Sequence, residues 1–197
     1  MRIGAWLGEE AAGMRWDELF ADLEGQLDAA EVAELSAEIA DRTRHETAQL
    51  GLLDRLAPAA GHDVRLHVIG AGQVNGRLDR VGAEWLLVSE AAGRQVLVPV
   101  AAVISAGGLS VLSRAPGQEG RVFARLGLGS ALRAIARDRL HVVVGLLDGS
   151  AVTGTVDRVG ADFLEVAEHG PGEPRRRSEV SGMRAVPFAA ISVVRSG

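Results

Sequence analysis

The feature that most constrains the fold is an internal repeat. Residues 76–90, GRLDRVGAEWLLVSE, recur almost unchanged at residues 154–168 as GTVDRVGADFLEVAE. Each copy alternates apolar and polar residues on both sides of a central glycine, which is the pattern of a strand, a turn and a second strand. The phrase has no cysteine and no evident acid–base pair, so its repetition indicates a shared architecture.

The alternation continues beyond the repeated phrase and predicts five strands in each copy. In the first copy the strands are expected at 64–68, 74–81, 84–90, 95–100 and from residue 103; in the second they are expected at 141–147, 151–159, 162–168, 183–188 and 191–196. The turn and core residues expected to correspond are Gly76 and Gly154, Gly82 and Gly160, Trp85 and Phe163, and Pro99 and Pro187. Five short strands leave exposed edges unless they bend, so each copy is expected to form a small barrel.

A helical segment is expected before each barrel. From residue 16 onward apolar residues recur at helical spacing, Asp28 is placed to cap a second helix, and Pro58 ends the segment. The predicted class is α+β: an N-terminal helical arm plus two tandem units, each a helix and a five-stranded barrel. The expected boundaries are a flexible tail at 1–15, an acidic helical arm at 16–57, a first barrel at 62–113, an amphipathic arginine-rich helix at 121–139, and a second barrel at 140–197.

The segment VVVGLLDGSAVTGTVDRVGADFLEV is similar to the first Sm motif, with a strand, a DG turn and a glycine-containing bent strand. The chain therefore resembles a tandem Sm-like (LSm-type) small β-barrel protein, and as a whole it also resembles an uncharacterised actinobacterial protein family. The Sm resemblance implies barrels that join through their fourth and fifth strands. The Asp and Asn positions of RNA-binding Sm proteins hold Gly160 and Leu164 here, so the resemblance does not carry over a uridine pocket. A PRC-like or SH3-like barrel adaptor is the alternative fold, because VLVPV and AVPFAAI suit those barrels too.

Composition argues against an enzyme. The chain has no cysteine, which excludes a disulfide framework and a cysteine nucleophile. Its five histidines show no metal-ligand spacing, and its serines have no nucleophile-elbow motif. We therefore expect no catalytic residues, no metal and no cofactor. No stretch is suited to a membrane span, and the cytoplasm is the expected location.

Charge is unevenly distributed along the chain. Residues 1–57 hold thirteen acids and five arginines, whereas residues 121–197 hold eight acids and eleven arginines. The candidate binding residues for nucleic acid or a partner are a helical i, i+4 row and a loop cluster, namely Arg121, Arg125, Arg133 and Arg137, and Arg175, Arg176 and Arg177. They would either track phosphates or face the acidic arm, and the net charge of −5 with no interleaved aromatics favours the second interpretation.

The function predicted from the sequence is a non-enzymatic oligomeric adaptor or scaffold. We expect a homo-oligomer, with a protein partner possible through the helical arm or the barrel edges and with no membrane partner. An RNA- or DNA-associated regulatory protein that uses the arginine-striped helix is the alternative function.

Overall fold

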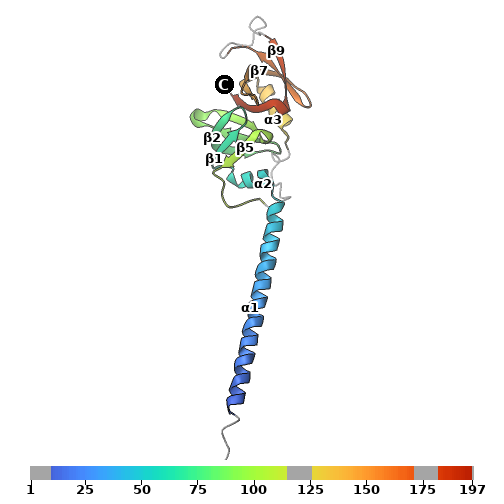
Figure 1. Ribbon diagram of the computed structural model, residues 1–197. Coiled ribbons are helices and arrows are strands. Elements are labelled where there is room, and N and C mark those ends of the chain that lie inside the picture. The colour runs from blue at the N-terminus through green and yellow to red at the C-terminus, as the bar shows by residue number, and fades with distance from the viewer. Residues whose placement is uncertain (1–9, 115–125, 171–181, 197) are drawn as a thin grey trace, which may run out of the picture. The chain divides into compact units, whose positions relative to one another are not determined.

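The chain divides into two compact units, Met1–Gln49 and Leu50–Gly197. The computed structural model describes residues 10–114, 126–170 and 182–196. In the first unit it shows one long helix, α1 (Glu10–Ala48), and in the second a ten-stranded antiparallel sheet with two short α-helices, α2 (Leu52–Leu56) and α3 (Leu128–Asp138) (Figure 1). The protein is therefore a mixed helix-and-sheet protein, as the sequence predicts.

Helix α1 is continuous, so the helix boundary expected at Asp28 is wrong. It begins at Glu10, within the segment expected to be a flexible tail, and it runs through Asp28 without a break. Alanines follow Asp28 and no proline occurs in the helix, so nothing in this stretch forces the backbone out of helical geometry. The carboxylate at residue 28 stays exposed on the helix surface, where it needs no capping role.

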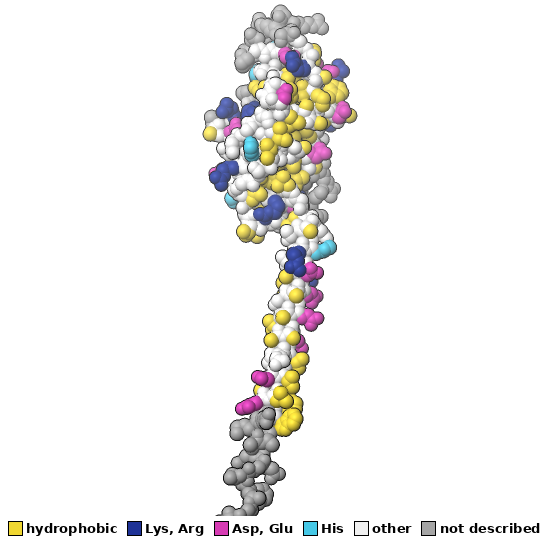
Figure 2. Space-filling view, in the orientation of Figure 1, with side chains coloured by type: hydrophobic (Ala, Val, Ile, Leu, Met, Phe, Trp, Pro, Cys, Tyr) yellow, Lys and Arg dark blue, Asp and Glu magenta, His cyan; other side chains and the backbone are white. Residues whose placement is uncertain are grey.

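The apolar residues of α1 lie on two different faces of the helix. One stripe is formed by Trp16, Leu19, Phe20, Leu23 and Leu27, and a second by Val32, Leu35 and Ile39. At 3.6 residues per turn the centres of the two stripes are separated by roughly 130° around the axis. All eight side chains are exposed, and Figure 2 shows both apolar and acidic side chains on the surface of the helix. A single straight neighbouring helix could cover only one of the stripes.

The first copy of the repeat forms five strands. They are β1 (Asp63–Val68), β2 (Gly72–Val81), β3 (Trp85–Ser89), β4 (Gln95–Pro99) and β5 (Val103–Gly107). Three short 3-10 helices, at Ala57–Ala59, Ala91–Gly93 and Val100–Ala102, connect the elements of this copy. Strand β1 pairs with both β2 and β5, and its burial alternates strictly, as the sequence predicts for a half-buried strand.

The second copy repeats this arrangement. Its strands are β6 (His141–Leu146), β7 (Ala151–Val159), β8 (Phe163–Glu168), β9 (Gly182–Pro187) and β10 (Ile191–Ser196), with a 3-10 helix at Phe188–Ala190 before the last strand. The register shifts between Leu78 and Arg80 in β2 and at the equivalent place, between Val156 and Arg158, in β7. The two copies therefore share their strand order, as the repeat predicts, and they also share a register shift that the sequence did not predict.

Backbone hydrogen bonds also recur at equivalent positions. The amide of Ile69 donates to the carbonyl of Ala102 at 2.9 Å, and that of Leu147 to Ala190 at 3.0 Å. The first turn differs between the copies, because Asp148 organises the DGS turn by accepting hydrogen bonds from the amide and hydroxyl of Ser150. These hydrogen bonds lower the pKa of Asp148 below its ordinary value.

The sheet is open, with strand order β5-β1-β2-β3-β4-β10-β6-β7-β8-β9. Among the described residues, β4 does not pair with β5 and β9 does not pair with β10, so hydrogen bonding does not close either copy into a barrel. A 3-10 turn after Pro99 carries the chain away from β4, and the same turn after Pro187 carries it away from β9. The fourth strand of each copy is thereby left available to another strand.

Two hydrophobic cores lie in the second unit, and each contains residues from both copies. The first is built mainly from β1–β4 and includes Leu56 from α2 together with Val193 from β10. The second combines Leu128 and Leu132 of α3 with β6–β8, and it takes in Trp85 and Leu97 from the first copy. The copies are therefore joined through shared cores as well as through strand pairing.

Candidate functional site

The helix expected over residues 121–139 is not continuous in the structure. Leu126 and Gly127 lie outside α3, which begins only at Leu128, so a helix running from residue 121 is wrong. Gly127 and Gly129 disfavour helix here, and the Glu84 carboxylate accepts the amide of Leu128 at 3.2 Å at the point where the helix starts. Arg121, Arg125 and the cluster Arg175–Arg177 lie outside the described residues.

Arg133 and Arg137 remain on α3, and both are exposed. The guanidinium of Arg133 donates to the carbonyl of Gly160 at 3.2 Å, so this arginine contacts the turn between β7 and β8. Arg133 therefore makes a contact within the second copy. Of the seven candidate arginines, only Arg133 and Arg137 lie among the described residues.

The two copies are joined by a strand pairing between a fourth and a fifth strand, the kind of join expected from the Sm resemblance. Val194 of β10 lies opposite Leu97 of β4, and Arg195 lies opposite Val96. Beyond this pairing, Ser196 and Gln95 exchange two longer hydrogen bonds, and the Arg195 guanidinium lies 3.8 Å from Glu90. The fourth strand of one copy is thus paired with the fifth strand of the other.

The turn between β1 and β2 strengthens this join. The hydroxyl of Ser192 in β10 is fully buried and donates to the carbonyl of Ile69. A Cβ atom at Gly70 would overlap the backbone of Leu146, so only glycine permits this close approach, and the positive φ of Gly70 also favours glycine. The two copies therefore meet through backbone as well as side chains.

The same pairing leaves two strands at the ends of the sheet. These are β5, the fifth strand of the first copy, and β9, the fourth strand of the second. Each carries a large exposed apolar side chain, Ile104 at 56% exposure in β5 and Met183 at 52% in β9. An exposed strand edge that also presents apolar side chains is a ready template for pairing with another strand.

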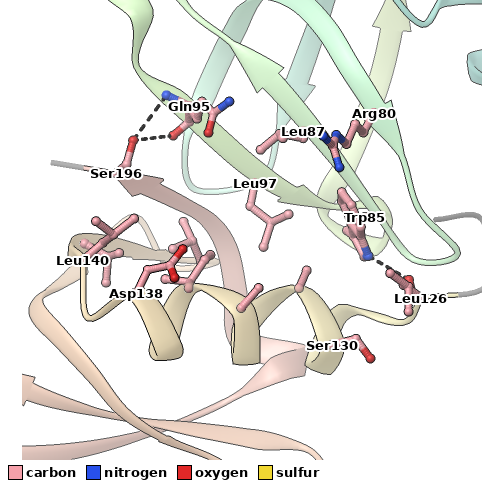
Figure 3. Close-up of a pocket in the computed structure, with 15 residues that line it drawn as sticks. Arg80, Trp85, Leu87, Gln95, Leu97, Leu126, Ser130, Asp138, Leu140 and Ser196 are labelled. Atoms are coloured by element: carbon pink, nitrogen blue, oxygen red, sulfur yellow. Dashed lines mark hydrogen bonds between the residues drawn. The ribbon is translucent and has the colours of Figure 1, made fainter. Parts of the chain in front are cut away.

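A pocket of about 280 Å³ lies where α3 faces β3, β4 and β10 (Figure 3). Its walls are mostly apolar and include Trp85, Leu97 and Ile135, while Gln95, Ser196 and Asp138 provide polar groups. The indole Nε1 of Trp85 donates to the carbonyl of Leu126 at 2.8 Å, which fixes the ring as one wall. No sequence signal pointed to this pocket, because it depends on how the two copies meet.

The residues predicted to correspond do occupy equivalent places, but their surroundings differ. Trp85 is 5% exposed, whereas Phe163 is only half-buried, because the described residues place α3 over Trp85 and no comparable helix over Phe163. Neither Gly82 nor Gly160 has a positive φ; each lies under the aromatic ring three residues later, where a Cβ atom would overlap that ring. Gly76 and Gly154 are needed for a similar reason, since a Cβ atom would overlap the backbone carbonyl of Ser89 or Ala167.

Two histidines that are distant in the sequence come together. The rings of His141 and His169 are 5.2 Å apart, edge to face, and His169 shares a 2.8 Å hydrogen bond with the hydroxyl of Thr155. The register of β6, β7 and β8 produces this pair, and sequence spacing gave no sign of it. Within the described ranges no group of three or more His, Cys, Asp or Glu side chains could hold a metal ion.

Fold and surfaces together define a tandem-repeat protein whose two copies join fourth strand to fifth strand. The sequence matches no protein-family model and no curated protein. None of the helices in the described part of the chain is both long and apolar enough to cross a membrane.

Proposed function

We propose that the protein is a non-enzymatic oligomeric scaffold of the cytoplasm, built on tandem Sm-like barrels that join edge to edge. The observation that carries this proposal is the pairing of β4 with β10 inside one chain. That pairing joins a fourth strand to a fifth strand, and it leaves one fifth strand, β5, and one fourth strand, β9, at the sheet ends. Two chains could therefore repeat between them the join that each already contains.

The internal join also supplies the register for such pairing. Aligning the copies at Pro99 and Pro187 makes Ala106 equivalent to Val194, and Ala185 equivalent to Leu97. In the proposed assembly Ala106 of one chain lies opposite Ala185 of the next, and Gly107 lies opposite Arg184. Three of these four residues, Ala106, Gly107 and Ala185, are small and permit close approach of the two backbones.

Position 104 adds support from burial. Ile104 is equivalent to Ser192, which is fully buried in the join within the chain, yet Ile104 is 56% exposed. The second copy buries this position in the join between the copies. We therefore expect Ile104 to become buried when β5 pairs with β9 of another chain. The join is head-to-tail, so repetition gives a ring if the rotation closes and a filament if it does not.

The experiment that tests this proposal is the molar mass of the full chain by light scattering, before and after Ile104→Lys. A lysine on an edge strand opposes further strand pairing, so the variant should contain fewer chains per particle than the wild type. Lys at Val111, an exposed position outside both sheet-end strands, is the matched control and should leave the particle unchanged. A monomeric wild type, or a variant with the wild-type mass, would contradict the proposal.

A further inference from the structure

The pocket between α3 and the first copy is lined by a carboxylate, that of Asp138, for which the described residues of the pocket offer no partner. Asp138 lines the pocket at the end of α3 (Figure 3), and the residue is exposed. Among the described residues Asp138 has no hydrogen-bond or ion-pair partner, although Arg137 and Arg139 are its neighbours in sequence. Asp138 is exposed at the mouth of the pocket, where its carboxylate can accept a charge-assisted hydrogen bond from a ligand cation.

The position of Asp138 in its helix also favours a cation. It is the last residue of α3, where the aligned peptide dipoles place partial negative charge and the final carbonyls lack helical partners. The Asp138 carboxylate adds a full negative charge at this end, where Arg137 is the basic residue of the last turn. The helix end and the carboxylate therefore attract the same kind of ligand.

Backbone geometry at the same point is also unusual. Arg139 follows Asp138 and has a φ of 50°. Among the described residues, no other residue except glycine has a positive φ. That conformation usually belongs to glycine, and a larger residue in it marks a place where the surrounding structure imposes the geometry. Here it ends α3 so that Asp138 and Leu140 both line the pocket.

The remaining walls define the rest of the ligand. Trp85, Leu87, Leu97, Ile135 and Val142 give a largely apolar surface, and the volume of about 280 Å³ is at the small end for ligand pockets. Arg80 lies beside Trp85, on the far side of Leu97 from Asp138 in Figure 3. Asp138 is the acid among the lining residues, so the cationic end of a ligand is directed to it.

We propose that this pocket binds a small primary amine with a compact apolar body, its ammonium group at Asp138 and its body against Trp85 and Leu97. The inference goes beyond the scaffold proposal and does not depend on it, because all the lining residues belong to one chain. A peptide or another protein would need a longer groove than this volume provides.

The test is isothermal titration calorimetry of the full chain with 3-phenylpropylamine, which is an ammonium ion at pH 7. The same body with an alcohol or a carboxylate end group, 3-phenylpropanol and 3-phenylpropanoate, provides the comparison. We expect saturable binding of one amine per chain, weaker binding of the alcohol and none of the carboxylate. Absence of saturable amine binding, or equal binding of amine and carboxylate, would overturn the proposal.

Variants separate the charge from the cavity. Asp138→Asn keeps the shape of the side chain, and it should weaken amine binding by about fivefold while leaving the alcohol unaffected. Asp162→Asn, an exposed acid in the turn before β8, is the matched control and should bind as the wild type does. Amine affinity that is unchanged in Asp138→Asn would also overturn the proposal.

A second measurement locates the ligand. In a chain with Trp6→Phe and Trp16→Phe, Trp85 is the remaining tryptophan, and the amine should change its fluorescence with the same midpoint as the calorimetric titration. Ala131→Leu narrows the pocket from the α3 side and should abolish both signals while the circular dichroism spectrum is retained. Amine binding without any response of Trp85 would place the ligand elsewhere and overturn the assignment.

Discussion

The ring of Phe163 lies directly over Gly160, so that a Cβ atom at residue 160 would overlap the ring carbon Cε1. Trp85 lies over Gly82 in the same way. This relationship explains why both copies keep a glycine between β2 and β3 or between β7 and β8, and it does so through packing, without a special backbone angle. The ring, and not the turn, excludes a side chain.

Alanine at these two glycines should therefore destabilise the protein unequally. Trp85 is buried and hydrogen-bonded to Leu126, so its ring cannot move aside, and Gly82→Ala should lower the free energy of unfolding by about 1–3 kcal/mol. Phe163 is half-buried and can shift, so Gly160→Ala should cost less. Urea denaturation measures both. Gly107→Ala, where a Cβ atom meets only ordinary contacts, is the control, and equal costs at residues 82 and 160 would contradict the packing explanation.

Truncating the two aromatic rings should show the same asymmetry. Trp85→Ala removes a buried ring from the core shared by the two copies, and it should cost about 3–5 kcal/mol. Phe163→Ala removes a ring that remains partly in solvent, so its cost should be clearly smaller. Chemical denaturation gives the values, and Trp85→Phe separates the loss of ring volume from the loss of the indole hydrogen bond. A larger cost at Phe163 than at Trp85 would be inconsistent with the burial seen here.

Removing the arm should leave the rest of the chain folded. Every buried core residue in the described chain lies beyond residue 49, so deletion of residues 1–49 should not change the melting temperature of the remaining unit. Deletion of residues 1–57 also removes the fully buried Leu56 and should cost about 2–5 kcal/mol. Differential scanning calorimetry compares the two. A large loss of stability on removing only residues 1–49 would show that the arm belongs to the core.

The arm deletion also tests self-association. The two apolar stripes of α1 are exposed, so we expect them to contribute contacts between chains, and the protein without residues 1–49 should contain fewer chains per particle. Light scattering measures this number. If it stays the same, assembly depends on the strand edges alone.

The arginines distinguish the scaffold from a nucleic-acid-binding protein. Changing Arg125, Arg133 and Arg137 together to Glu should alter assembly or stability only modestly, since exposed ion pairs contribute about 0–1 kcal/mol each. The wild type should bind RNA and DNA weakly in a filter-binding or anisotropy assay. Tight wild-type binding that falls steeply between about 50 and 200 mM salt and is lost in the triple variant would favour the alternative function.

The repeat and its strands were predictable because they depend on local pattern. The alternation in DVRLHV and the shared DRVGA turn identified strands β1–β3 and β6–β8 within a few residues. The continuity of α1 through Asp28 was missed because a residue with capping chemistry is also tolerated on an exposed helix face. The start of α3 at Leu128 was missed because it depends on Glu84, 44 residues earlier in the chain.

The candidate site was harder to predict because it forms only where the copies meet. Val194 opposite Leu97, the pocket at Asp138 and the pair of His141 and His169 all depend on distances between segments far apart in sequence. A repeat shows which positions are equivalent, but it does not show which edge of one copy joins which edge of the other. In the described part of the chain the sheet is open because β4 pairs with β10 of the other copy and does not pair with β5 of its own copy.

The most direct test of the central claim mixes two variants that are each blocked at one sheet end. In the chain from residue 50 onward, Ile104→Lys blocks β5 and Met183→Lys blocks β9, and both side chains are exposed at present. Each variant alone should be monomeric by light scattering, because head-to-tail pairing needs both ends. An equimolar mixture should form a dimer of twice the mass and no larger species, since each chain offers one free end. Two variants that keep the wild-type mass, or a mixture that remains monomeric, would contradict assembly through β5 and β9.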